Sequence, residues 1–233
     1  NNKVDLICAI ATPAAQTVAN VTSDIPIVAT AVTDYKTAKL VKDDAKPGTN
    51  VTGTTDMNPV AEQLDLLLKL VPNAKTIGTI YCSSEVNSQL QVELLKKAAA
   101  AKGITVKEAT VSTVNDIQQA ARSLTGDVQA VYVPTDNVLA SAIPTLISVT
   151  EEAKLPVICA EGGMVRAGGL ATLGVDYYKL GFQTGVMAAD ILSGKAKPAD
   201  MAIQAQKEFK PTINLKEAAK SGLKVPEELL KGA

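Results

Sequence analysis

The chain of 233 residues contains no histidine. Histidine is the commonest general base and the commonest transition-metal ligand in proteins, so its absence argues against most hydrolase and metalloenzyme classes. The chain also lacks a glycine-rich phosphate loop and any apolar run long enough to span a bilayer. We therefore expect no cofactor, no metal and no transmembrane segment.

Net charge and cysteine content exclude further partners and kinds of site. A formal net charge of −1 provides no general attraction to nucleic acid or to an anionic membrane, so no nucleic-acid partner is expected. The three cysteines are Cys8, Cys82 and Cys159. An odd number cannot pair completely in disulfide bonds, and their spacing matches no zinc motif. Because each lies in or at the end of an apolar run, we interpret all three as small buried side chains.

Short apolar runs alternate with amphipathic stretches along the chain. Runs that are apolar throughout indicate strands covered on both faces, and strand–helix–strand recurrence indicates a doubly wound α/β architecture with parallel sheets. Strands are expected at Val4–Ile10, Ile25–Ala31, Thr76–Cys82, Ile104–Thr110, Val128–Val133, Leu155–Ala160 and Leu170–Val175. Helices are expected around 60–71, 90–101, 115–124, 144–153 and 177–192.

Two polar stretches interrupt this alternation. Lys42–Asn58 is rich in glycine and threonine, and Ser193–Asp200 is similar in character. Both are candidates for crossings between two lobes, and an interpretation as plain surface loops is nearly as well supported.

Polar residues collect where the expected strands end. In open parallel sheets, ligands bind beyond the carboxyl ends of the strands, where helix N-termini also point. Thr12 is expected to cap a helix with Pro13 at its first position, which leaves N–H groups for a carboxylate. The candidate ligand-binding residues are Thr12, Pro13, Thr33, Asp34, Ser83, Ser84, Asn87, Ser88, Asp136, Asn137, Glu161, Asp176 and Tyr177.

Helix capping explains any one of these residues, but the set is more informative than its members. Hydroxyls, carboxamides and acidic groups gather at strand ends with few basic residues among them. Such a set suits a neutral or zwitterionic solute, with N–H groups for its carboxylate and Asp or Glu for its ammonium group.

Long blocks of the sequence resemble one known family. The blocks are ATPAAQTVAN, IPIVATAVTD, GTNVTGT, IGTIYCSSEVNS, VYVPTDN, AEGGMVRAGGLATLGVDYYKLGFQTG and TINLKEAAKSGLKVPEELL. They resemble the ABC transporter substrate-binding family that includes tryptophan- and tyrosine-type binding proteins. The resemblance implies a type I periplasmic-binding-protein fold, in which two Rossmann-like lobes close on a solute in the cleft between them by hinge motion.

The resemblance also implies boundaries, partners and location. Lobe I would comprise 1–55 with a return at 174–202, lobe II would comprise 56–173, and 203–233 would form a C-terminal crossing segment and helix. The thirteen candidate residues match loops that line the family's cleft. The resemblance further implies a small polar solute, an amino acid and in some members an aromatic one, together with ABC permease subunits as partners. Location would be extracytoplasmic, either periplasmic or lipid-anchored at the outer face of the cytoplasmic membrane.

One departure from the family pattern concerns lobe I. The first strand here resembles the third strand of that lobe, so we expect lobe I to be incomplete at its N-terminus. An incomplete sheet exposes an edge, which predicts strand pairing with another chain or a dimer.

Two other functions remain open at this point. The same two-lobed fold serves as the ligand-sensing domain of transcription regulators. A Rossmann-like enzyme is the second alternative, with Cys82 beside Ser83 as a conceivable nucleophile, although no base of the usual kind accompanies it.

Overall fold

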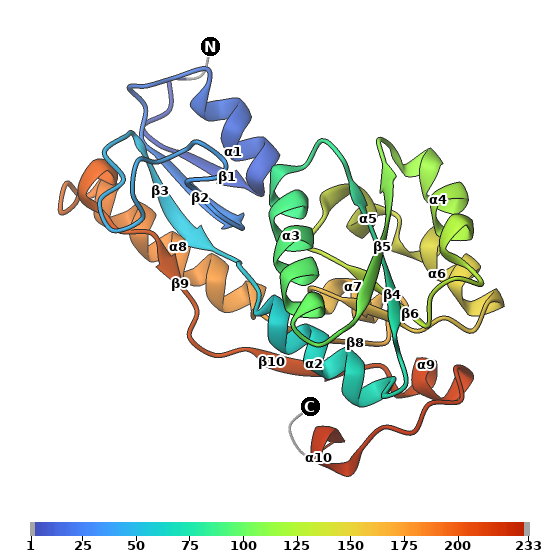
Figure 1. Ribbon diagram of the computed structural model, residues 1–233. Coiled ribbons are helices and arrows are strands. Elements are labelled where there is room, and N and C mark those ends of the chain that lie inside the picture. Colours follow the sequence, from blue (N-terminus) through green and yellow to red (C-terminus); the bar gives the residue numbers. More distant parts are fainter. Residues whose placement is uncertain (1–2, 231–233) are drawn as a thin grey trace. The chain divides into compact units, whose positions relative to one another are not determined.

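The structure, a computed structural model, describes residues 3–230 (Figure 1). It contains two compact units. Unit 1 comprises the described residues up to Met57 together with Val175–Glu208, and unit 2 comprises Asn58–Gly174 together with the described residues from Phe209. The chain therefore passes from one unit to the other three times. No helix among residues 3–230 is long and apolar enough to cross a membrane.

Unit 1 is built on a four-stranded parallel sheet of order β1-β2-β3-β9. Helices α1 (Thr12–Ala19) and α8 (Tyr177–Leu192) cover opposite faces of it (Figure 1). A short 3₁₀ helix, η2 (Pro198–Asp200), precedes the last strand. The strands are β1 (Ile7–Ile10), β2 (Ile27–Val32), β3 (Val51–Thr55) and β9 (Gln204–Ala205).

The polar segment Lys42–Asn58 is more than a loop or a crossing, because it contains β3, one of the two inner strands of this sheet. Gly53 sits there with φ +150°, and a Cβ atom would lie 1.8 Å from the carbonyl oxygen of Ala29 and 2.4 Å from the Tyr35 hydroxyl. Glycine thus lets Tyr35 donate hydrogen bonds to the carbonyls of Ala29 (2.8 Å) and Thr54 (3.1 Å). The second polar stretch, Ser193–Asp200, lies wholly within unit 1 rather than at a crossing.

Unit 2 is built on a six-stranded sheet of order β10-β8-β7-β6-β4-β5, in which only β10 runs antiparallel to its neighbour. Its strands are β4 (Thr76–Cys82), β5 (Thr105–Val111), β6 (Ala130–Val133), β7 (Val157–Cys159), β8 (Ala171–Gly174) and β10 (Lys210–Ile213). Its helices are α2 (Val60–Leu70), α3 (Val86–Ala100), η1 (Val114–Asp116), α4 (Ile117–Leu124), α5 (Asn137–Ser141), α6 (Ile143–Glu152), α7 (Gly162–Arg166), α9 (Leu215–Lys220) and α10 (Glu227–Leu230).

Hydrophobic cores cover both faces of the unit 2 sheet. Alternate residues of β6 show this directly, because Val131 and Val133 pack against α4–α7 while Ala130 and Tyr132 pack with α2 and α3. A strand buried on both faces needs apolar residues at successive positions. The expected doubly wound α/β architecture with parallel-rich sheets is confirmed.

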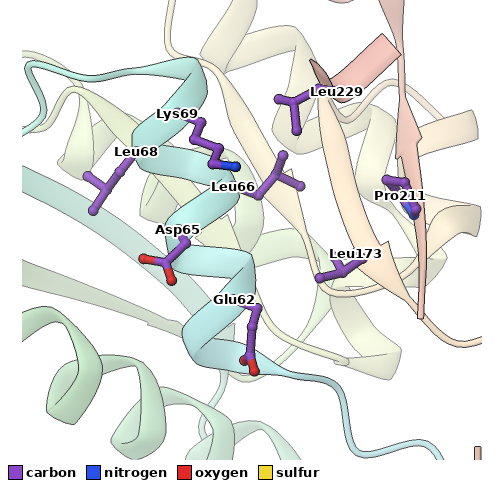
Figure 2. Close-up of a pocket in the computed structure, with 8 residues that line it drawn as sticks. All are labelled: Glu62, Asp65, Leu66, Leu68, Lys69, Leu173, Pro211 and Leu229. Carbon is purple, nitrogen blue, oxygen red and sulfur yellow. The ribbon is translucent and has the colours of Figure 1, made fainter. Parts of the chain in front are cut away.

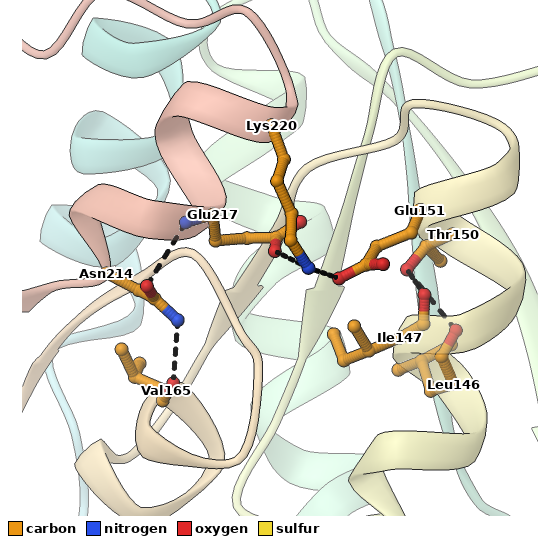
Figure 3. A network of polar contacts seen from close by, with 8 residues as sticks. All are labelled: Leu146, Ile147, Thr150, Glu151, Val165, Asn214, Glu217 and Lys220. Atoms are coloured by element: carbon orange, nitrogen blue, oxygen red, sulfur yellow. Dashed lines mark hydrogen bonds and ion pairs between the residues drawn. The ribbon is translucent and has the colours of Figure 1, made fainter.

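The C-terminal segment is fastened to unit 2 by polar contacts (Figure 3). Asn214 caps α9 by accepting a hydrogen bond from the Glu217 N–H (3.1 Å) and donates to the Val165 carbonyl (3.4 Å). Lys220 Nζ lies 2.5 Å from Glu151 Oε1 and 3.7 Å from Glu217 Oε2. These contacts connect α9 to α6 and to α7.

The cysteines differ from one another in burial. Cys82 and Cys159 are buried as expected, but Cys8 is exposed on β1, so the expectation of three buried cysteines is wrong at that position. All three are free thiols. Burial, assisted by the charge of Glu161, raises the pKa of the Cys159 thiol and keeps it protonated.

Candidate functional site

The first strand end of unit 1 differs from its expected geometry. Helix α1 begins at Thr12, so Thr12 is a helical residue and the capping position belongs to Ala11, which adopts φ 73°. Thr12 is buried, Pro13 is exposed, and no side chain among the described residues caps the helix. The first-turn N–H groups of α1, at the positive end of the helix dipole, therefore receive no acceptor from a capping side chain.

Two expected residues of unit 1 meet on a carboxylate that the sequence did not single out. Thr33 Oγ1 donates to Asp56 Oδ1 (3.2 Å), and the Tyr177 hydroxyl donates to Asp56 Oδ2 (2.7 Å). Asp56 is fully buried. Asp56 directly follows β3, and the polar sequence of that strand is typical of a loop, so only an acidic residue in a loop-like stretch marks the position.

A cavity of about 310 Å³ lies beside this cluster in unit 1. It is lined by Thr33, Asp34, Tyr35, Asp44, Thr55, Met57, Ile203 and Ala205. Asp34 also accepts a hydrogen bond from the Thr37 N–H (2.7 Å), as in an Asx turn. Burial and then the charge of Asp56 raise the pKa of Tyr35, so this hydroxyl stays a hydrogen-bond donor.

In unit 2, Asp136 ties the ends of two strands together. It follows β6, caps α5 by accepting from the Leu139 N–H (2.9 Å), and accepts from the Cys82 N–H (2.6 Å) at the end of β4. Ser88 Oγ donates to the same carboxylate (2.7 Å). Burial and then the nearby charge of Glu85 raise the pKa of Asp136. The two expected residues Asp136 and Ser88 are thus in direct contact.

Glu85 is the residue of unit 2 that sequence reasoning missed. It is 5% exposed, and its carboxylate accepts from the backbone N–H groups of Asn137 (3.0 Å) and Val138 (3.2 Å). It also accepts from the Nδ2 atoms of Asn87 (2.9 Å) and Asn137 (2.6 Å). Glu85 therefore fixes two expected residues, Asn87 and Asn137, although its position just before a helix distinguished it little from a surface residue.

The remaining expected residues make helix-capping or surface contacts. Glu161 caps α7 through the N–H groups of Gly163 and Met164, and Asp176 caps α8 through those of Tyr178 and Lys179. Ser83 and Ser84 are exposed, and Ser84 Oγ lies 3.2 Å from the Cys82 sulfur. Capping accounts for the local contacts of Glu161 and Asp176.

A larger cavity of about 610 Å³ lies elsewhere in unit 2, between α2, β8, β10 and α10 (Figure 2). Leu66, Leu173 and Leu229 point into it, and Glu62, Asp65 and Lys69 lie along the α2 side. None of the thirteen expected residues lines it. Asp65 pairs with Lys102 and Lys69 pairs with Glu228, so part of the charged rim of this cavity is engaged in surface ion pairs.

Comparison with known proteins places the chain among binding proteins. The chain is similar to the tyrosine-binding protein of Clostridioides difficile strain R20291, with 46% identity over 196 residues that cover 84% of this chain and 57% of that protein. It thus spans little more than half the length of that relative.

Solved structures agree. The chain is similar to the ABC domain in complex with L-Trp from Streptococcus pneumoniae, with a TM-score of 0.96, 44% identity, and coverage of 100% of this chain and 78% of that one. A ligand-free, open substrate-binding protein with adhesive properties from Clostridium difficile matches with a TM-score of 0.72 and 45% identity, over 96% of this chain and 76% of that one.

More distant likenesses show the fold alone. A glucose-galactose binding protein from Geobacillus stearothermophilus matches at 21% identity with a TM-score of 0.61, and a LacI-family regulator from Bifidobacterium animalis at 13% with a TM-score of 0.62. The fold is that of type I periplasmic binding proteins. The model of the family described as ABC transporter substrate binding protein matches residues 1–233. This chain belongs to the ABC transporter substrate-binding protein family, whose members bind substrates rather than convert them.

Proposed function

We propose that this chain is the solute-binding component of an ABC importer and that its ligand is an aromatic L-amino acid, tyrosine or tryptophan. The observation that carries the proposal is the pair of relatives at 46% and 44% identity, one a tyrosine-binding protein and the other a domain in complex with L-Trp. The thirteen strand-end residues are proposed to contact the ligand. The protein captures the solute without chemistry and delivers it to permease subunits.

Hinge closure is part of this proposal. Relatives of nearly equal identity include one in complex with L-Trp and one that is ligand-free and open. The chain has three crossings between its units, at Met57–Asn58, Gly174–Val175 and Glu208–Phe209, and these are the proposed hinge points. A ligand shifts the population toward the closed state only through its higher affinity for that state.

The proposed location is extracytoplasmic, as for substrate-binding proteins of ABC transporters generally. Lipid anchoring at the outer face of the cytoplasmic membrane remains a prediction. The expected pairing with another chain through an exposed sheet edge also remains a prediction.

A thermal-shift screen of the chain against the common L-amino acids tests the proposal. A ligand with a Kd of about 1 μM, present at about 100 μM free concentration, should stabilise the protein by about 2.7 kcal/mol. L-tyrosine or L-tryptophan should give the largest shift, and small-angle scattering should show a smaller radius of gyration with that ligand. If no amino acid raises the melting temperature, the proposed function is wrong.

A further inference from the structure

The cavity between α2, β8, β10 and α10 has the size and the lining of a small-molecule site (Figure 2). Its volume of about 610 Å³ exceeds the 310 Å³ of the unit 1 cavity and lies within the range of ligand pockets, roughly 300–1,000 Å³. All of its described lining residues belong to unit 2. The cavity is thus formed without any contribution from unit 1.

The wall that the sheet supplies is apolar. Leu173 of β8 and Pro211 of the edge strand β10 are partners in the antiparallel pair, and Leu66 and Leu229 point into the space from α2 and α10 (Figure 2). None of the described lining residues has a hydroxyl or amide side chain. The Leu173 carbonyl oxygen already accepts a hydrogen bond from Gln63 Nε2 (2.7 Å). The cavity therefore suits a hydrocarbon or aromatic body rather than a sugar.

One charged group of the lining has no counter-charge. Asp65 Oδ1 lies 2.7 Å from Lys102 Nζ, and Lys69 Nζ lies 3.0 Å from Glu228 Oε1, so these charges are paired. Glu62 forms no ion pair within the described part of the chain. The lining and its partners together therefore carry one negative charge, and it belongs to Glu62. A cationic group is complementary to that charge, and a carboxylate is repelled by it.

We propose that this cavity is a second ligand site, separate from the strand ends, and that it takes a small amphiphilic monocation. The apolar body of the ligand packs against Leu66, Leu173 and Pro211, and its ammonium group lies beside Glu62. An amino acid is disfavoured here, because its own carboxylate would also face Glu62. The site thus selects amines over zwitterions and acids of the same size.

The place of the site in the chain links it to the proposed hinge, and this link rests on the proposed function. Glu62, Leu173 and Pro211 each lie within four residues of one of the three crossings between the units. An occupant that fits one arrangement of α2, β8 and β10 better than another shifts the closure equilibrium. It then changes the affinity for the strand-end ligand, and that ligand changes the affinity of the occupant by the same factor.

The test compares three molecules that share a chain of eight carbons. They are n-octylamine, which is cationic at pH 7, the neutral 1-octanol and the anionic octanoate. Calorimetric Kd values should rank them in that order, with octylamine favoured over octanoate by about tenfold or more. The methyl NMR signals of Leu66, Leu173 and Leu229 should move as octylamine is added.

Two substitutions of glutamate separate the charge of the site from the charge of the protein. Glu62→Gln should weaken octylamine by about threefold to tenfold and leave octanol unchanged, so that the preference between them falls by the same factor. Its matched control is Glu152→Gln, which removes one negative charge from an exposed residue of unit 2 outside this lining. That control should leave the preference unchanged.

A third substitution fills the cavity. Leu229→Phe places a larger apolar side chain in the space and should weaken octylamine and octanol alike, by about tenfold or more, without lowering the melting temperature of the ligand-free protein. If this variant does not fold, Leu173→Phe replaces it. Octylamine binding that survives the filling substitution, or that responds equally to both glutamate substitutions, overturns the site.

The remaining outcomes separate the site from other occupants and from the proposed function. A dimer that octylamine dissociates, measured by light scattering, would show that a second copy of the chain fills the cavity, and this overturns the small-molecule site. A Kd for L-tyrosine that changes by about twofold or more with octylamine, in the wild type but not in Leu229→Phe, supports the link to the hinge. An unchanged Kd overturns the link and leaves the site. A protein that binds octylamine in the cavity but no amino acid overturns the proposed function alone.

Discussion

The two units place carboxylates at their strand ends in different ways. In unit 2, Asp136 and Glu85 accept hydrogen bonds from backbone N–H groups at the end of β4 and in the first turn of α5 as well as from side chains. In unit 1, Asp56 accepts from the hydroxyls of Thr33 and Tyr177. A backbone-held carboxylate is part of how strands and helices are joined, whereas a hydroxyl-held one depends on side chains that can rotate.

The strands of the two sheets also differ in how polar their side chains are. Strand β3 of unit 1 is polar, and its threonine hydroxyls bond sideways to Thr30, Thr184 and the Met201 carbonyl. Strand β6 of unit 2 consists of Ala130–Val133 and lies between two apolar cores. Hydrogen bonds of threonine hydroxyls therefore stabilise the unit 1 sheet, whereas burial of apolar surface on both faces stabilises the unit 2 sheet.

The largest expected difference between the units comes from replacing one glycine in each sheet by alanine. Gly53→Ala in β3 forces a methyl group against the Ala29 carbonyl, so we expect unit 1 to lose about 4 kcal/mol or more of unfolding free energy. In Gly78→Ala in β4, the new Cβ atom meets only side-chain atoms, of Leu124 at 3.0 Å and of Val128 at 3.4 Å, so the effect should stay within about 1 kcal/mol. Denaturant titrations monitored by amide hydrogen exchange in each unit measure the unfolding free energies of both variants. Equal effects of the two substitutions would remove the distinction between the sheets.

This contrast also explains what the sequence could and could not reveal about the fold. Strand β4 was expected at the bounds it has, because seven residues covered on both faces leave an apolar run. Strand β3 was missed because Thr52, Gly53 and Thr54 resemble a loop. Their place in a sheet depends on partners far away in sequence, such as Thr184 and Met201.

The candidate site divides in a similar way. Residues that directly follow a strand, such as Thr33 and Asp136, could be found from local pattern alone. Glu85, Asp56 and Asn58 could not, because what distinguishes them is burial and contact with residues that are distant in sequence, including Asn137, Tyr177 and Thr135. Local pattern identifies which residues are near a strand end, but only packing shows which of them are buried and which residues they contact.

The intermediate effect tests the backbone-held carboxylate. Asp136→Asn keeps the shape but leaves one of the donors around Oδ1 and Oδ2 facing an NH₂ group, so we expect a loss of about 1–3 kcal/mol from unit 2. The control is Asp34→Asn in unit 1, where one oxygen suffices for the Thr37 N–H, and the loss should be below about 0.5 kcal/mol.

The pH dependence of that difference has a definite sign. The pKa of Asp136 is raised in the folded state, so its contribution to stability is present at pH below its unfolded value of about 3.9 and is lost as pH rises through the folded value. The asparagine side chain of the Asp136→Asn variant does not titrate. The gap in unfolding free energy between wild type and variant should therefore be widest in acid and should narrow as pH rises. A gap that widens with pH would contradict the assigned shift.

The smallest expected effect tests whether the stability change depends on the groups that bind the carboxylate, side chains or backbone N–H groups, rather than on the unit in which it lies. Glu217 lies in unit 2, but its carboxyl group meets the side chains of Glu151 and Lys220 rather than strand-end N–H groups (Figure 3). Burial and then the charge of Glu151 raise the pKa of Glu217, so its contribution is present below its unfolded value of about 4.3 and is lost as pH rises through the folded value. At neutral pH, glutamine in its place can donate to Glu151 without a second negative charge. Glu217→Gln should therefore be neutral or slightly stabilising at pH 7, by less than about 0.5 kcal/mol, and less favourable relative to wild type in acid.

Lys220→Met, which removes the cation between the same two carboxylates, is the matched comparison and should cost up to about 1 kcal/mol at low salt. A loss for Glu217→Gln as large as that for Asp136→Asn would show that side-chain-held and backbone-held carboxylates are equally fixed in this fold.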